Sequence, residues 1–236
     1  GRNYFLKNNS EIDLSFKNQI TNEELDFEEL YNSRKSRLMD YGGNRYVDKF
    51  VNIVNKSITI DNKLAKAVIE GYFKVLYRKD EYEVARLHVN YLNENLNLNF
   101  FNIKKLNFFL APPFLNFIKI NGRPKKFKFG KWIIIFFHFL IFLKPLRDSI
   151  FDIFSFSKER KLEKKLIKSY ENDLDFIFKN FNNDKNEILI DFAKLPIKVV
   201  GFGPVKMKSI ENYYKLRSVF YNKIENPNIM NLNAAE

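Results

Sequence analysis

The chain has 236 residues, of which 45% are hydrophobic and 17% aromatic, and its formal net charge is +12. This composition is too apolar for a disordered polypeptide, and the length permits one domain with a substantial core. The absence of cysteine excludes disulfides, thiolate metal sites and iron–sulfur clusters from this chain, and two histidines are too few for a His-rich zinc site. Because the lysines are spread along the sequence, a solvated basic surface explains the net charge more simply than an anionic partner does.

Residues 1–22 are polar and rich in asparagine, with no apolar run that could serve as a signal peptide. We expect a linker or the end of a preceding domain here, and a cytoplasmic location for the protein. A first amphipathic helix is predicted over residues 23–40, because Leu25, Leu30 and Leu38 recur at helical spacing before a pair of glycines. A second helix is predicted over residues 63–77, with Asp61 as its N-cap.

A dense block of charged and apolar residues begins at Lys79. Asp80, Glu81 and Glu83 favour the start of a helix, and Glu83 stands at helical neighbour spacing from both Lys79 and Arg86. One of these carboxylates could act as a general acid or base. We prefer the interpretation that they form ion pairs fixing two helices, because charge networks of this kind are commonly structural.

The spacing of apolar residues then changes from helical to alternating, over residues 96–100, 106–108, 117–120 and 127–129. The last two of these runs flank Asn121-Gly122, which is a strong signal for a β-hairpin. The sequence therefore predicts a mainly helical α+β fold, a multi-helix domain over residues 23–225 with one small antiparallel sheet.

The predicted hairpin carries a run of basic residues with aromatic residues between them and no acid. We prefer the interpretation that the lysines face water and the phenylalanines face the core, as the alternation predicts. A seam against an acidic neighbouring domain comes second, and single-stranded nucleic acid comes last. The basic residues are Lys119, Arg123, Lys125, Lys126, Lys128 and Lys131, and the aromatic residues are Phe127, Phe129 and Trp132.

Residues 132–143 are apolar except for His138 and end before Lys144. A helix that crosses a bilayer needs about 20 apolar residues, so this segment is predicted to be a buried helix at the centre of the core, and no membrane partner is expected. His138 is then expected to be a core residue with a satisfied ring nitrogen.

Helical patterns return after this segment. Ser157 is predicted to cap a long helix that reaches Phe181, a shorter helix stops at Pro196, and the last one runs from Pro204 to Ile224. Residues 226–236 are predicted to be a loose tail.

The turn before the last helix contains Gly201 and Gly203, followed by Lys206 and Lys208. A dinucleotide fingerprint is excluded, because the third glycine position is a lysine and no βαβ unit surrounds the turn. Backbone N–H groups at a helix start, with lysines in its first turns, are suited to an anion such as a coenzyme A phosphate or a carboxylate. The simpler interpretation, which we prefer, is a glycine turn that lets the chain pack closely.

Taken together, these blocks resemble the C-terminal domain of fused indolepyruvate ferredoxin oxidoreductases, within the 2-oxoacid oxidoreductase superfamily. Their order and spacing agree over about residues 24–220, and Phe109 and Pro204 depart from the pattern where the family commonly has histidine. The matching blocks are Lys79–Leu87, Leu110–Pro113, Gly122–Pro124, Phe129-Gly130 with Trp132, Leu146-Arg147 with Phe151-Asp152, Glu159-Arg160, and Gly201–Gly203 with Val205-Lys206.

The resemblance implies a parent enzyme that decarboxylates an arylpyruvate or another 2-oxoacid on thiamine diphosphate and magnesium. Electrons would pass through iron–sulfur clusters to ferredoxin, and the acyl group would pass to coenzyme A. None of the residues for that chemistry lies in this chain, so the resemblance implies an accessory domain that packs on the upstream catalytic domains of a homo-oligomeric enzyme. A free-standing basic module that binds nucleic acid or anionic surfaces is the alternative.

Overall fold

The structure is a computed structural model that describes residues 5–6, 12–13, 27–95, 106–110, 119–120, 123–182 and 184–225. The chain forms two compact units, a larger one of residues 25–78 and 146–236 and a smaller one of residues 1–24 and 79–145. The fold is mainly helical with small antiparallel sheets, as predicted. The predicted domain of residues 23–225 is therefore made of two such units, and the tail at 226–236 lies outside the described residues.

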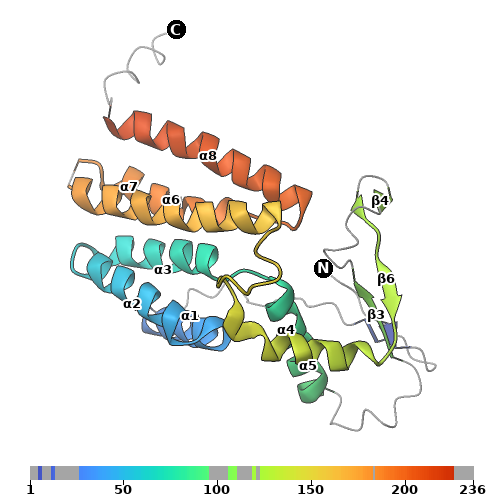
Figure 1. Ribbon diagram of the computed structural model, residues 1–236. Helices are drawn as coiled ribbons and strands as arrows, with labels where there is room; N and C mark the ends of the chain where they lie inside the picture. The colour runs from blue at the N-terminus through green and yellow to red at the C-terminus, as the bar shows by residue number, and fades with distance from the viewer. Residues whose placement is uncertain are drawn as a thin grey trace. The chain divides into compact units, whose positions relative to one another are not determined.

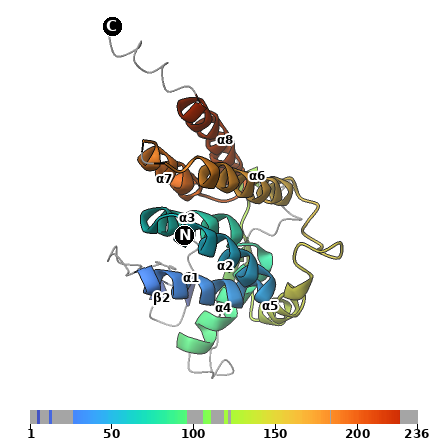
Figure 2. The same ribbon diagram turned by 90° about the vertical axis from the view of Figure 1, so that its left-hand side faces the viewer.

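The larger unit is a stack of helices built around α3. On one side of α3 lie α1 and α2, and on the other lie α6 and α7, with α8 beyond them (Figures 1 and 2). The helices are α1 (Phe27–Gly42), α2 (Asn44–Ile58), α3 (Asn62–Leu76), α6 (Lys158–Asn180), α7 (Asn186–Lys194) and α8 (Pro204–Glu225), with the 3-10 turn η4 (Leu195–Lys198); the 3-10 turn η3 (Lys144–Leu146) spans the boundary between the two units.

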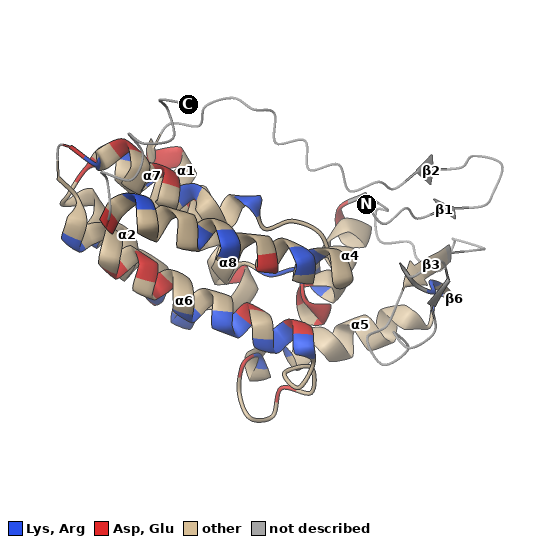
Figure 3. Ribbon diagram, turned by 90° about the horizontal axis from the view of Figure 1, so that it is seen from above, with Lys and Arg blue, Asp and Glu red and all other residues tan. Residues whose placement is uncertain are grey.

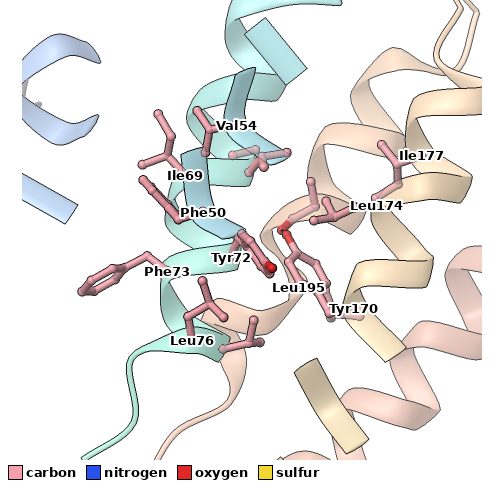
Figure 4. Close-up of a cluster of buried hydrophobic side chains, with 14 of the residues drawn as sticks. Phe50, Val54, Ile69, Tyr72, Phe73, Leu76, Tyr170, Leu174, Ile177 and Leu195 are labelled. Atoms are coloured by element: carbon pink, nitrogen blue, oxygen red, sulfur yellow. The ribbon is translucent and has the colours of Figure 1, made fainter. Parts of the chain in front are cut away.

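Helix α3 is central because apolar residues occupy most of its circumference. Asp61 caps it as predicted, accepting a hydrogen bond from the Leu64 amide at 2.8 Å. Its buried side chains meet Phe50 and Val54 of α2 on one side and Tyr170 and Leu174 of α6 on the other (Figure 4). The core of the larger unit is this double layer of aliphatic and aromatic contacts.

Gly71 is the position at which α3 approaches α7. A Cβ atom there would lie 2.2 Å from the Ala193 carbonyl oxygen and 2.4 Å from the Tyr170 hydroxyl. The same hydroxyl donates a hydrogen bond of 2.5 Å to the Ala193 carbonyl. Only glycine leaves room for this contact, since the nearest obstacle is backbone.

We expect Gly71→Ala to lower the free energy of unfolding by about 1–3 kcal/mol, because the added methyl group must push α3 away from α7. Urea denaturation of the variant and the parent chain measures the difference. Gly130→Ala is the matched control, because its Cβ would meet nothing closer than 3.7 Å. Equal losses in the two variants would contradict the close approach at Gly71.

The smaller unit combines sheets and helices. Strands β2, β1, β3 and β6 lie in that order, all antiparallel, with Phe108 opposite Phe129 in the β3–β6 pair, and β4 pairs separately with β5. The elements are β1 (Phe5–Leu6), β2 (Ile12–Asp13), α4 (Glu81–Asn95), β3 (Leu106–Leu110), β4 (Lys119–Ile120), β5 (Arg123–Pro124), β6 (Phe127–Phe129) and α5 (Ile133–Phe142).

An antiparallel pair is present where the hairpin was predicted, but the second strand of the pair is 123–124 and not 127–129. Ile120 pairs with Arg123 and Lys119 with Pro124, whereas 127–129 pairs with β3 instead of 117–120; the predicted turn at Asn121-Gly122 lies outside the described residues. Pro124 has no N–H group to donate to the ladder, which limits this pair to a short stretch and leaves the next strand to pair elsewhere. The alternation over 96–100 falls outside the described residues.

Helix α2 was not predicted from the sequence. Val47, Phe50 and Val54 are buried at helical spacing, a stripe for which no element was predicted. Gly43, with φ of 71°, makes a sharp corner that starts a new helix directly. The helix predicted over 23–40 begins at Phe27 and runs to Gly42.

The prediction that residues 132–143 form the centre of the core is wrong. The segment is helical as α5, but it belongs to the smaller unit, and only Ile133, Phe137 and Leu140 of the helix are buried. His138 is exposed, and its Nδ1 lies 2.9 Å from the Ile134 carbonyl oxygen, so it is not a core residue. No described helix has the length and apolarity needed to cross a bilayer.

Candidate functional site

The larger unit contains a buried ion-pair centre that begins at Arg78, the residue two positions beyond α3. Its side chain is 3% exposed. Its Nη2 donates to Asp148 Oδ2 at 2.5 Å and to the Tyr46 hydroxyl at 3.2 Å, and its Nε donates to the Tyr41 hydroxyl at 3.3 Å. Arg78 therefore links α1, α2 and the segment that precedes α6.

Asp148 is the anchor of that segment. It has φ of 62°, the left-handed region that is uncommon for residues other than glycine. Besides Arg78, its carboxylate accepts a hydrogen bond from Tyr46 and lies 3.4 Å from Lys164 Nζ, and its backbone N–H donates to Asp152 Oδ2 at 2.9 Å. Strained backbone persists only where its surroundings fix it, and these contacts do so.

Glu163 of α6 forms the second half of the ion-pair centre. It is 2% exposed, accepts a hydrogen bond from Arg160 Nη1 at 2.5 Å and accepts another from Lys206 Nζ of α8. Arg78 Nη1 lies 4.0 Å from its Oε2 and has no hydrogen-bond partner among the described residues. The centre thus joins α3, α6, α8 and the segment at Asp148.

The electrostatics keep both acids of the centre ionised. Burial by itself raises the pKa of Asp148, but the Arg78 guanidinium and the Tyr46 hydrogen bond outweigh it and lower that pKa to about 2. Burial also raises the pKa of Glu163, but the positive charges of Arg160, Lys206 and Arg78 lower it by more, so the pKa of Glu163 is lowered overall. Neither carboxylate is poised to exchange a proton near neutral pH, so the centre is suited to holding structure.

Acid titration is expected to reveal this centre. Because the folded-state pKa of Asp148 is lowered to about 2 and that of Glu163 is also lowered, the stability they contribute is complete above their unfolded pKa values of about 4 and is lost as the pH falls through the lowered folded-state values. We expect the double variant Asp148→Asn, Glu163→Gln to have a lower free energy of unfolding than the parent at pH 6. This difference between variant and parent should become smaller as the pH falls toward 2. Urea unfolding at a series of pH values measures the difference, and a difference independent of pH would contradict the assignment.

The charged block at the start of α4 carries one of the predicted ion pairs. Glu83 is fully buried and accepts from Arg86 Nε at 2.9 Å and from Nη2 at 2.7 Å. Asp80 Oδ1 accepts from the Glu83 amide at 2.9 Å and so caps the helix, while Lys79 is exposed. This ion pair lies within α4 alone, so the interpretation that the charged block fixes two helices stays a prediction.

The glycine turn before α8 meets carboxylates of this chain where the sequence predicted an anion. Gly201 and Gly203 both have positive φ, and the Gly203 amide donates to Glu159 Oε1 at 3.3 Å. Lys206 binds Glu163, as described above, and Lys208 is exposed. The chain itself thus supplies an acidic partner for Lys206. Binding of an external anion at this turn stays a prediction.

The basic run shows the alternation that was predicted for β6. Lys128 is exposed between the half-buried Phe127 and Phe129, and Lys125 lies 5.5 Å above the Phe127 ring. Trp132 is 59% exposed and packs edge-on against Phe129 at 5.7 Å. Lys126 is exposed as well, whereas the side chains of Lys119 and Arg123 lie outside the described residues.

Sequence reasoning missed an apolar surface on the larger unit. Ile150 is 83% exposed and Phe156 is 72% exposed, in a segment that has no helical or alternating period. Bulky apolar residues in a stretch without periodicity are the only signal that could have revealed it. Among the described residues no group of three potential ligands could hold a metal ion.

Comparison with known proteins gives a family. The model of the family of unknown function DUF6537 matches residues 27–218, which spans both compact units. No curated protein and no solved structure matches the chain. The chain therefore belongs to DUF6537, a family of unknown function.

Proposed function

We propose that this chain is an accessory domain that packs on the catalytic domains of a 2-oxoacid oxidoreductase of the indolepyruvate ferredoxin oxidoreductase type. The observation that carries the proposal is the exposed apolar face of α5. Ile135 is 76% exposed, Phe139 53% and Phe142 78%. A helix that is apolar on every side is normally covered on every side, so this face is suited to a protein neighbour.

The charge distribution supports the same conclusion. Figure 3 shows α5 without a charged residue along its length, whereas α6 and α8 carry both basic and acidic residues. The buried face of α5 packs on α4 and β3, with His88 and Phe108 against Phe137 at centroid distances of 5.1 and 5.4 Å. The opposite face of α5 therefore exposes apolar side chains to water, which is unfavourable unless another surface covers them.

The proposed activity of the parent enzyme rests on the resemblance described in the sequence analysis. Several residues that carry that resemblance, Arg147, Asp152, Arg160 and Lys206, are buried or half-buried around the ion-pair centre of the larger unit. In the proposed enzyme, upstream domains supply thiamine diphosphate, magnesium and iron–sulfur clusters in the cytoplasm, with coenzyme A and ferredoxin as partners. This chain would stabilise the assembly and shape it.

Deleting residues 24–236 from the intact oxidoreductase tests the proposal. We expect loss of assembly or of cofactor content, with turnover falling as a consequence. The double variant Ile135→Ser, Phe139→Ser should reproduce part of that loss in the full enzyme, whereas His138→Ser on the same helix should not. Normal cofactor content, assembly and turnover in the deletion would refute the proposal.

The alternative, a basic module for nucleic acid, rests on the exposed Lys125, Lys126 and Lys128. A titration of the isolated chain with single-stranded nucleic acid at two salt concentrations separates the two functions, because phosphate contacts weaken steeply with salt. Tight binding that falls with salt would favour the alternative.

A further inference from the structure

The start of α6 is bordered by two segments that expose bulky apolar side chains. Phe151 is 68% exposed and Ile153 59% in the segment before α6, and Phe202 is 53% exposed and Val205 61% at the start of α8. We call this set the Phe151 surface, and its members are Ile150, Phe151, Ile153, Phe156, Val200, Phe202 and Val205.

Contacts with α6 hold the two segments at the same end of that helix. The Gly203 amide donates to Glu159 in the first turn of α6, and Lys206 binds Glu163 one turn later. Ser157, which directly follows Phe156, caps the helix by accepting from the Arg160 amide at 3.2 Å. The apolar residues of the two segments thus border one helix end.

The first segment has a fixed backbone. Arg78 and Tyr46 hold Asp148 in its left-handed conformation, as described above. Asp152 then accepts from the amides of Asp148 at 2.9 Å and Phe154 at 3.0 Å, so a buried carboxylate folds the chain that displays Phe151. The backbone that carries Phe151 is therefore held in place before any partner binds, which lowers the entropy cost of binding.

The charges around the Phe151 surface are sorted by sign. Each acid of the two segments and the first turns of α6 is buried or half-buried and has a partner: Asp148, Asp152, Glu159 and Glu163 all accept hydrogen bonds within the unit. The exposed charged residues of these stretches are lysines, namely Lys158, Lys161, Lys165, Lys198 and Lys208. The surface is therefore apolar with a basic border.

We propose that the Phe151 surface docks a protein surface that presents an apolar groove bordered by carboxylates. This deepens the proposed function, on which it rests, by naming the surface of the larger unit that meets the catalytic domains and the chemistry of its counterpart. Opposite charges across such a border steer the encounter and fix its orientation. A second copy of this surface is disfavoured as the partner, because lysine would face lysine.

A protein fits the observations better than an anionic lipid surface does. A fluid bilayer requires no fixed backbone geometry, whereas this segment is held by a buried ion pair and by Asp152. Tyrosine and tryptophan, the residues enriched at membrane interfaces, are absent from residues 147–158 and 197–208, although the chain contains 12 tyrosines.

The test uses the full chain and synthetic amphipathic helical peptides of equal length, one of leucine and glutamate and one of leucine and lysine. Fluorescence anisotropy measures binding, and vesicles of phosphatidylcholine with phosphatidylserine form a separate arm. We expect the glutamate peptide to bind about tenfold tighter or better than the lysine peptide. The double variant Phe151→Ser, Phe156→Ser should weaken that binding about tenfold or more.

The double variant Ile58→Ser, Val219→Ser, at exposed apolar positions of the same unit outside the Phe151 surface, is the matched control and should leave the affinity for the glutamate peptide unchanged. Circular dichroism checks that both variants keep the parent fold. Equal affinity for the two peptides, no dependence on Phe151 and Phe156, or no binding at all would overturn the proposal. Binding to the vesicles alone, lost in the Phe151 and Phe156 variant, would overturn it in favour of a membrane.

Failure of the proposed function would look different. The peptide titration needs only the isolated chain, so it can succeed while deletion of the chain from the oxidoreductase has no effect. The Phe151 surface would then dock an acidic protein outside that enzyme. If the deletion impairs assembly as expected but neither peptide binds the chain, the accessory role would stand, and the Phe151 surface would have no part in it.

Discussion

Arg78→Met is expected to lower the free energy of unfolding by about 3–5 kcal/mol, the range for removing one partner of a buried ion pair. Methionine keeps much of the volume of the side chain but cannot donate to Asp148, Tyr46 or Tyr41. Asp148 would then stay in a strained conformation with Lys164 as its remaining cation, at 3.4 Å. Chemical denaturation followed by circular dichroism measures the loss.

Lys49→Met is the control for Arg78→Met. Lys49 is 55% exposed and lies 3.9 Å from Glu171, and an exposed pair of this kind contributes about 0–1 kcal/mol. A loss at Arg78 no larger than the loss at Lys49 would show that the buried centre does not hold the larger unit together.

The second large effect is expected at Asp173, which joins α6 to α8. Its carboxylate is fully buried and accepts hydrogen bonds from Tyr213 at 2.8 Å, Tyr221 at 2.7 Å and Arg217 Nε at 2.8 Å. Burial, followed by the Asp173 charge, raises the pKa of Tyr213, so its hydroxyl stays protonated as a donor. Asp173→Ala leaves these donors without an acceptor and is expected to cost about 3–5 kcal/mol of unfolding free energy.

Asp175→Ala provides the matched control, because Asp175 is exposed on the same helix two positions later. Thermal unfolding of both variants measures the difference, and we expect the midpoint to fall by several degrees only for Asp173→Ala. Protease digestion at a temperature below the midpoint should also cleave near α8 first in that variant. Identical midpoints in the two variants would contradict the role of Asp173.

Local signals in the sequence predicted the helices that have caps and stripes. Asp61 and Ser157 both accept hydrogen bonds at the helix starts where they were expected, at Leu64 and Arg160. Such signals are read over a few residues and survive in the tertiary structure because they satisfy N–H groups that the helix leaves open. Helix α2 was missed because glycine can make a corner as readily as a loop.

Longer-range pairing could not be predicted in the same way. Strand β6 pairs with β3, more than a dozen residues earlier, and the alternation of Phe127 and Phe129 fits either partner equally well. The ion-pair centre has the same difficulty, since Arg78 and Asp148 are 70 positions apart. Contacts between distant positions depend on the fold as a whole, and no local pattern encodes them.

The apolar segment at α5 illustrates the limit for function. Its composition predicted burial, and the structure buries one face and exposes the other. Composition reports that a segment favours an apolar environment, but it does not say whether that environment belongs to the same chain. The exposed face of α5 and the Phe151 surface are apolar but are not covered by this chain, so they indicate where a partner could bind.

Hydroxyl-radical footprinting of the chain, alone and within the intact oxidoreductase, tests the accessory role most directly. In the isolated chain, Phe139, Phe142, Phe151 and Phe156 should label strongly, because each is more than half exposed. Within the enzyme we predict strong protection of Phe139 and Phe142 on α5, and of Phe151 and Phe156 where the Phe151 surface docks. Unchanged labelling of all these side chains, in an enzyme that is fully assembled and active, would contradict the account.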